Sequence, residues 1–166
     1  MSNELLEIYL TDHCAAAAAG SRRMRRLADA ERRSEDGSTL ERVANEIDED
    51  RTTLQSIMKA EGIEPRWYKS AMTRVGEAIG TLKTNGALFH RSPLTSLVEL
   101  EVMRMGVTGK LDLWTALRRT PLAERRDFDA LIERASRQLR DLDEAHARRA
   151  AVLDGAPQPT PSPVCS

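Results

Sequence analysis

The chain has 166 residues, with 25 Lys and Arg against 26 Asp and Glu and a formal net charge of −1. This length fits a single domain with a real core, because chains of roughly 150 residues bury about 68–70% of their unfolded surface. The balanced charge provides no overall field for nucleic acid or an anionic membrane, so we expect neither as a partner. Aromatic residues make up only 4% of the chain and charged residues 31%, which favours packed helices over sheets.

Three features of the sequence bear on where the protein works. The N-terminus carries Glu4, Glu7 and Asp12, without a basic segment or an uninterrupted apolar run, so we expect no secretory signal. No segment reaches the roughly 20 apolar residues that a membrane span needs. Cys14 and Cys165 are isolated, which fits neither a disulfide framework nor a metal-ligand spacing. These features predict a cytoplasmic protein.

Apolar spacing predicts two long helices in the first part of the chain. The first covers residues 4–31. Ser38 and Glu41 have the pattern of a capping box that opens the second helix, and Gly62 is expected to end it in the left-handed conformation. The expected core faces are Leu5, Tyr9, Ala16, Gly20 and Leu27 on the first helix, and Leu40, Val43, Ile47, Leu54 and Met58 on the second.

Proline marks the start of each of the three remaining helices. A short third helix begins at Pro65 and ends before an Asn-Gly turn. Ser92 and Pro93 are expected to cap and open the fourth helix, and Thr120 and Pro121 the fifth. The core face expected for the fifth helix consists of Phe128, Leu131, Ile132, Ala135, Leu139 and Leu142.

This order of elements predicts an all-α fold. Two long helices, a shorter one and two more long helices indicate a four-helix bundle in which the middle helix crosses over along the bundle. We expect the bundle to occupy residues 1–154. Residues 155–166 are rich in proline and are expected to form a disordered tail.

The fourth predicted helix, residues 94–117, is apolar almost all the way round, which predicts that it is buried among other helices. Leu94, Val98 and Met105 share one stripe of this helix and are expected to lie in its driest part. A carboxylate buried there must pair or become protonated, because an isolated buried charge is costly. The polar residues that fall in the same stripe are Glu101, Thr108 and Asp112.

Ion pairing is the first expectation for the two acids of this stripe. Arg104 lies three residues after Glu101 and is its predicted partner. The predicted partner of Asp112 is either Thr108 or Arg51, which lies at the border of the apolar face of the second helix. Asp50 borders the same face, so we expect an interhelical network between it and Glu101 or Asp112 that fixes helix register.

Other polar residues have a structural and a functional interpretation. His146 lies on the apolar face of the fifth helix, and we expect a core histidine bonded to Asp143, with metal or proton-transfer chemistry as the alternative. The cluster of Arg22, Arg23, Arg25 and Arg26 lacks interleaved aromatic residues, which predicts a solvated face rather than a nucleic-acid site. A candidate protein contact surface consists of Trp67, Tyr68, Leu88 and Phe89.

Several segments resemble an uncharacterised bacterial branch of the ferritin-like helical bundles. They are YLTDHCAAAAAGSRRMRRLA, NEIDEDRTTLQSIM, SPLTSLVELEVMRMGVTGKLDLW and RDLDEAHARRA, within residues 4–151. The resemblance implies a ferritin-like four-helix bundle with an additional crossover helix, five helices in all.

The resemblance also implies where metal ligands are expected. Ferritin-like di-iron proteins place one Glu on each of two helices and a Glu-x-x-His pair on each of the other two. Ile47 and Asp50 stand where the pair of the second helix is expected, so that half-site is lost. Asp143 and His146 retain an Asp-x-x-His pair, and Glu101 stands on the fourth helix. Asp12 or His13 of the first helix could complete a mononuclear site with Glu101 and His146.

Two functions follow as hypotheses. The first is a non-catalytic bundle without a cofactor, which has lost the di-iron site and acts as a scaffold or binding protein, as a homodimer or with another protein. The second is an oxidoreductase or stress protein that holds iron or manganese at a reduced site made of Glu101, Asp143 and His146. A bundle that binds a small apolar ligand between its helices is a third possibility.

Overall fold

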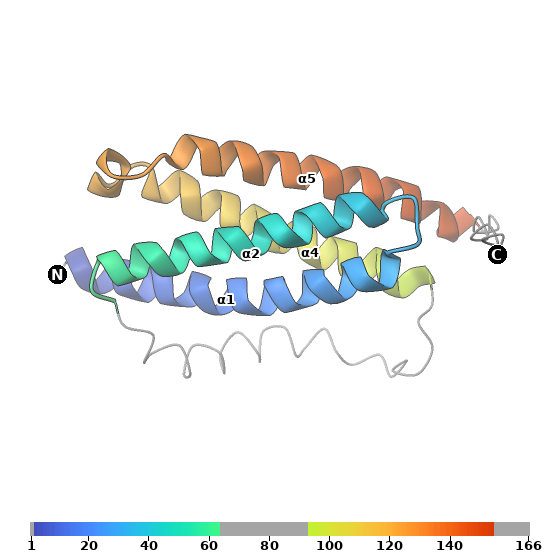
Figure 1. The fold of residues 1–166 in the computed structure, drawn as a ribbon, viewed down its shortest axis with the longest axis horizontal. Helices are drawn as coiled ribbons and strands as arrows, with labels where there is room; N and C mark the ends of the chain where they lie inside the picture. The colour runs from blue at the N-terminus through green and yellow to red at the C-terminus, as the bar shows by residue number, and fades with distance from the viewer. Residues whose placement is uncertain (1, 64–92, 155–166) are drawn as a thin grey trace, which may run out of the picture.

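The computed structural model describes residues 2–63 and 93–154, and these form a bundle of long helices (Figure 1). Two 3-10 turns, η3 (Pro121–Glu124) and η4 (Ala151–Asp154), precede and follow the last long helix. The described ranges contain no strand, which confirms the predicted all-α class. The long helices are α1 (Ser2–Glu31), α2 (Gly37–Ala60), α4 (Pro93–Leu117) and α5 (Phe128–Ala150).

The four helices pack as two hairpins, α1 with α2 and α4 with α5. Helix α1 also contacts α4, and α2 contacts α5, so the four surround a common core. Helices α2 and α4 run in the same direction (Figure 1), which places Ile63 and Pro93 at opposite ends of the bundle. The predicted third helix, the predicted contact surface with Trp67 and Phe89, and the predicted tail lie outside the described residues.

The two ends of α2 differ in how well local sequence predicted them. Gly62 has a φ of 71°, as predicted, and Ile63 N–H bonds to Met58 O at 2.9 Å, which completes a Schellman motif. The prediction of a capping box at Ser38 was wrong, because α2 begins one residue earlier, at Gly37, and Ser38 lies inside its first turn. A side chain at Gly37 would meet the carbonyl oxygen of Arg32 at 2.6 Å, so this tight turn requires glycine.

The predicted start of α5 was also wrong. Thr120 and Pro121 open the short turn η3, where Thr120 Oγ1 accepts a hydrogen bond from Leu122 N at 3.3 Å. Helix α5 starts at Phe128, and Asp127 caps it by accepting a bond from Ala130 N at 3.0 Å. A Thr-Pro pair is suited to the start of a short helical turn as well as of a long helix. Here it starts the short turn in the α4–α5 connection.

The core confirms the predicted faces of α2 and α5 and corrects that of α1. All five residues predicted for α2 are buried. Phe128, Ala135 and Leu142 of α5 are buried, and the other three predicted residues pack against them. On α1, Leu5 is 73% exposed and Ala16 is exposed. The residues of α1 that do enter the core are Leu10, Cys14, Ala15, Ala18, Met24, Leu27 and Ala28.

Helix α4 buries a different stripe from the one predicted. Leu94, Val98 and Met105 are 51%, 39% and 60% exposed, and Glu101, Thr108 and Asp112 are exposed with them. Because α4 has apolar residues on both sides, its sequence does not show which side is buried. The prediction therefore assigned the wrong stripe to the core. The buried stripe consists of Leu97, Leu100, Met103, Val107, Leu113, Trp114 and Leu117.

A pair of methionines on α4 provides a matched test of this packing. Met103 is 3% exposed and Met105 is 60% exposed. We expect Met103→Ala to lower the free energy of unfolding by about 2–5 kcal/mol, because a buried methionine leaves a cavity. Met105→Ala should change it by less than about 0.5 kcal/mol. Chemical denaturation of both variants measures the difference, and equal losses would show that Met105 is buried too.

Candidate functional site

The residues predicted to bind metal lie along the seam between α4 and α5. Glu101 Oε1 and His146 Nε2 are 3.3 Å apart, and their side chains are 48% and 25% exposed. Asp143 instead forms an ion pair with Arg104, at 2.5 Å between Oδ1 and Nε. The predicted pairs, Glu101 with Arg104 and His146 with Asp143, are therefore wrong. Each acid instead pairs with the basic residue of the opposite helix.

The residues of α1 proposed to complete a metal site lie elsewhere. The ring of His13 packs edge-on against Tyr9 with centroids 4.6 Å apart. Burial lowers the pKa of His13, and the charges of Asp12 and Asp112 oppose this shift. Across residues 2–63 and 93–154, no group of three or more His, Cys, Asp and Glu side chains is arranged to hold a metal ion.

The interior of the bundle contains a network of charges centred on Asp50. Asp50 is 2% exposed, and its carboxylate accepts a hydrogen bond from Lys110 Nζ of α4 at 2.5 Å. Arg134 of α5 pairs with the other carboxylate oxygen and also reaches Glu49 at 2.9 Å. Gln138 is fully buried and accepts a bond from Lys110. Asp50 thus joins α2, α4 and α5 through two cations.

Burial and partner charges set the ionisation of this network. Burial is the largest influence on Lys110 and lowers its pKa, with a further contribution from Arg134, while Asp50 opposes the shift. Burial alone would raise the pKa of Glu46. Hydrogen bonds from Gln138 and Arg137 outweigh this effect and hold the pKa of Glu46 below its ordinary value. The carboxylate of Glu46 is therefore stabilised as an anion by groups of the chain itself.

The predicted interhelical network at Asp50 exists, but its predicted partners were wrong. Glu101 and Asp112 are exposed, whereas the actual partners are Lys110 and Arg134. In the sequence both cations look like ordinary surface residues of amphipathic helices. Their only local signal is that each lies on the border of an apolar face.

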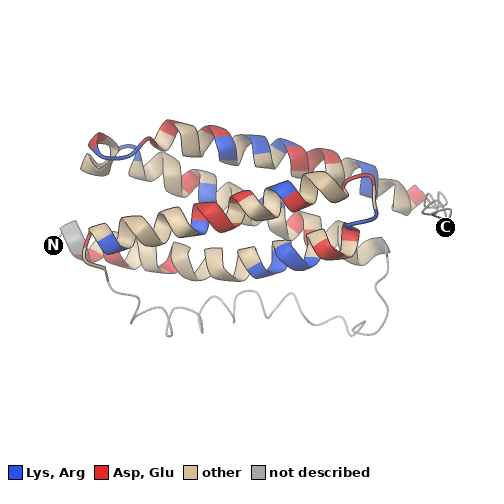
Figure 2. Cartoon of the chain, in the orientation of Figure 1, with Lys and Arg blue, Asp and Glu red and all other residues tan. Residues whose placement is uncertain are grey.

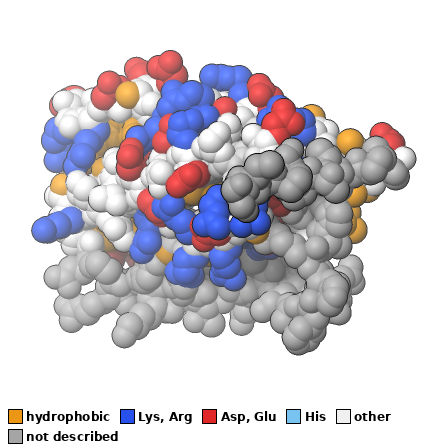
Figure 3. Space-filling view, turned by 45° about the vertical axis from the view of Figure 1, so that its right-hand side comes forward, with side chains coloured by type: hydrophobic (Ala, Val, Ile, Leu, Met, Phe, Trp, Pro, Cys, Tyr) orange, Lys and Arg blue, Asp and Glu red, His pale blue; other side chains and the backbone are white. Residues whose placement is uncertain are grey.

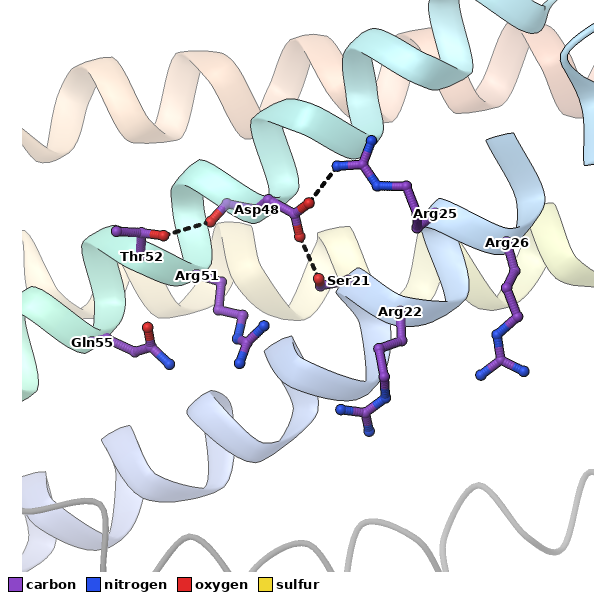
Figure 4. Close-up of a pocket in the computed structure, with 8 residues that line it drawn as sticks. All are labelled: Ser21, Arg22, Arg25, Arg26, Asp48, Arg51, Thr52 and Gln55. Carbon is purple, nitrogen blue, oxygen red and sulfur yellow. Dashed lines mark hydrogen bonds and ion pairs between the residues drawn. The ribbon is translucent and has the colours of Figure 1, made fainter. Parts of the chain in front are cut away.

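A second site is an open groove of about 610 Å³ between α1 and α2 (Figure 4). Basic residues gather in the C-terminal half of α1, next to this groove (Figure 2). Elsewhere acidic and basic side chains are interspersed, as over the described part of the face in Figure 3. The residues that line the groove are Ser21, Arg22, Arg25, Arg26, Asp48, Arg51, Thr52 and Gln55.

One acid lies in this groove and it is already paired. Asp48 accepts hydrogen bonds from Ser21 and Arg25 (Figure 4). Burial raises its pKa, but these bonds and the charges of Arg25 and Arg51 lower it overall. The described lining of the groove therefore has four arginines and a single carboxylate, which is paired with Arg25. The predicted solvated face at Arg22 and Arg26 is exposed, but it forms one side of a defined cationic groove.

Comparison with known proteins gives no relative: no protein-family model matches the chain, and neither curated proteins nor solved structures show a significant match. No helix within the described residues is long and apolar enough to cross a membrane. The features that bear on function are therefore the network at Asp50 and the surface of the bundle.

Substitution at Asp50 tests whether its network holds the bundle together. We expect Asp50→Ala to lower the free energy of unfolding by about 3–5 kcal/mol, because Lys110 and Arg134 lose their shared buried counter-ion. The control is Asp129→Ala, since Asp129 pairs with Arg118 at the surface with 76% of its side chain exposed. That change should cost less than about 1 kcal/mol.

A double variant separates charge from packing in the same experiment. Asp50→Leu combined with Lys110→Met removes the buried charge pair and leaves Arg134 with Glu49. It should recover most of the stability lost in Asp50→Ala, as measured by denaturant unfolding. A double variant as unstable as the single one would contradict the electrostatic explanation.

Proposed function

We propose that this protein is a non-catalytic helical bundle of ferritin-like type, which acts as a binding or scaffold protein without a metal cofactor. Two observations support the ferritin-like assignment. The parallel direction of α2 and α4 requires a connection along the length of the bundle, as in ferritin-like folds. The network at Asp50 also brings inward-facing polar side chains of α2, α4 and α5 together inside the bundle, where ferritin-like proteins place their sites.

The observation that carries the proposal is the pairing of Asp50 with Lys110 and Arg134. In ferritin-like enzymes, carboxylates that project inward bind metal cations. Here the inward-facing carboxylate of Asp50 binds two cations of the chain itself, at 2.5 Å in the case of Lys110. A metal ion would have to displace both cations or be repelled by them. The network thus serves the role of a structural ion cluster.

A second candidate function rests on the contact between Glu101 and His146. These residues, with Asp143 one turn from His146, retain a carboxylate and imidazole ligand set suited to iron or manganese. Such a site would lie at the surface seam of α4 and α5, and Asp143 would have to leave Arg104 to join it.

Metal analysis distinguishes the two functions. Protein purified without chelator, and the same protein loaded anaerobically with ferrous iron and desalted, should contain no stoichiometric iron or manganese by plasma mass spectrometry. Glu101→Ala and His146→Ala serve as controls for metal bound at the seam. Stoichiometric metal that disappears in both variants would overturn the proposal and establish the metal-binding alternative.

The binding function has its own test, because α4 exposes Leu94, Val98 and Met105. A second copy of the chain that covers this stripe would give a particle of twice the 18.5 kDa of one chain. We expect light scattering to report this dimer. Met105→Glu should convert it to a monomer, because a carboxylate would be buried at the contact. Ala147→Glu, at an exposed position of α5, is the control and should leave the dimer intact.

A further inference from the structure

The groove between α1 and α2 contains cations that form no ion pair with a described carboxylate of the chain. Arg25 is paired with Asp48, but no ion pair joins Arg22, Arg26 or Arg51 to any carboxylate among the described residues. Elsewhere in the bundle, arginines beside acids do pair, as Arg134 and Arg148 show. The groove therefore differs from the rest of the charged surface in having an excess of positive charge.

The three arginines without an ion pair line one groove. Arg22 and Arg26 are one helical turn apart on α1, so they lie on the same side of that helix. Arg51 comes from α2, and Figure 4 shows its guanidinium beside the groove, on the opposite wall from Arg22. Thr52 and Gln55 add uncharged hydrogen-bonding groups to the α2 wall.

Arg51 is held at the wall of the groove by partial burial of its side chain. Its Nε atom is buried and has no hydrogen-bond partner, as is also the case for the Nε atom of Arg134. Since Nε is enclosed, an anion in the groove would bind the terminal nitrogens of the Arg51 guanidinium. Arginine binds phosphate and carboxylate groups with two parallel hydrogen bonds, and its two terminal nitrogens can form such a pair.

We propose that this groove binds a small anion that carries two or more phosphoryl groups. Several guanidinium groups spaced by a helical turn match several linked anionic centres better than a single one. A volume of about 610 Å³ is in the range of small-molecule sites. Single-stranded nucleic acid is a poorer fit, because none of the described residues that line the groove is aromatic and able to stack with a base. This site is independent of the scaffold role proposed for the bundle.

Titration calorimetry of the full chain with inorganic tripolyphosphate tests the proposal. At an ionic strength of about 0.15 M, tripolyphosphate should bind with one-to-one stoichiometry and more tightly than orthophosphate or sulfate. Arg22→Gln and Arg51→Gln should each weaken binding about tenfold or more, because each removes charged hydrogen bonds. Arg140→Gln, on the exposed face of α5, changes the net charge equally and should leave the affinity unchanged.

Several results would overturn the proposal. One is the absence of tripolyphosphate binding to the wild-type protein, and another is an equal loss in Arg140→Gln. Tighter binding of a single-stranded oligonucleotide or a poly-glutamate peptide would assign the groove to a macromolecule instead. The titrations use protein whose metal content has been measured, so binding through a metal ion at the α4–α5 seam is recognised by its loss in His146→Ala.

Discussion

The fold depends on how one buried carboxylate is compensated. Asp50 is 2% exposed and lies between helices that meet only in the folded chain. Its charge is tolerated because Lys110 and Arg134 donate to its two oxygens from α4 and α5. A shift of either helix by one residue would move a cation away and leave a buried charge unpaired, at a cost of several kcal/mol. The network therefore selects one alignment of α2, α4 and α5, which the less directional apolar contacts would not do alone.

Local sequence predicted those parts of the fold that local physics determines. The core face of α2, the left-handed Gly62 and the boundaries of α4 depend on periodicity, on backbone conformation and on a Pro at a helix start. The partners of Asp50 do not depend on such local features, because Lys110 and Arg134 are 60 and 84 residues away along the chain. Their pairing is set by how the helices pack, and periodicity within one helix cannot show it.

Helix α4 illustrates a second limit of the same kind. Its residues are apolar on more than one side, so Met103 and Met105 are equally suited to a core position by type alone. Packing against α1 and α5 buries Met103 and leaves Met105 exposed. Glu101 was expected to need a buried partner only because its stripe was expected to be buried. Once that stripe is at the surface, the contact of Glu101 with His146 across the seam needs no compensating cation.

The contrast between the interior and the groove indicates where function should be sought. Inside the bundle the carboxylate of Asp50 has its cations, so nothing from outside is needed to complete the network. Among the described residues that line the groove between α1 and α2, the single carboxylate is paired with Arg25, and Arg22 and Arg51 form no ion pair with a described acid. Neighbouring like charges repel, and the net charge of −1 shows that the chain has enough acids to neutralise them. The other described acids are placed elsewhere, so in the proposed complex the bound anion supplies the negative charge at this groove.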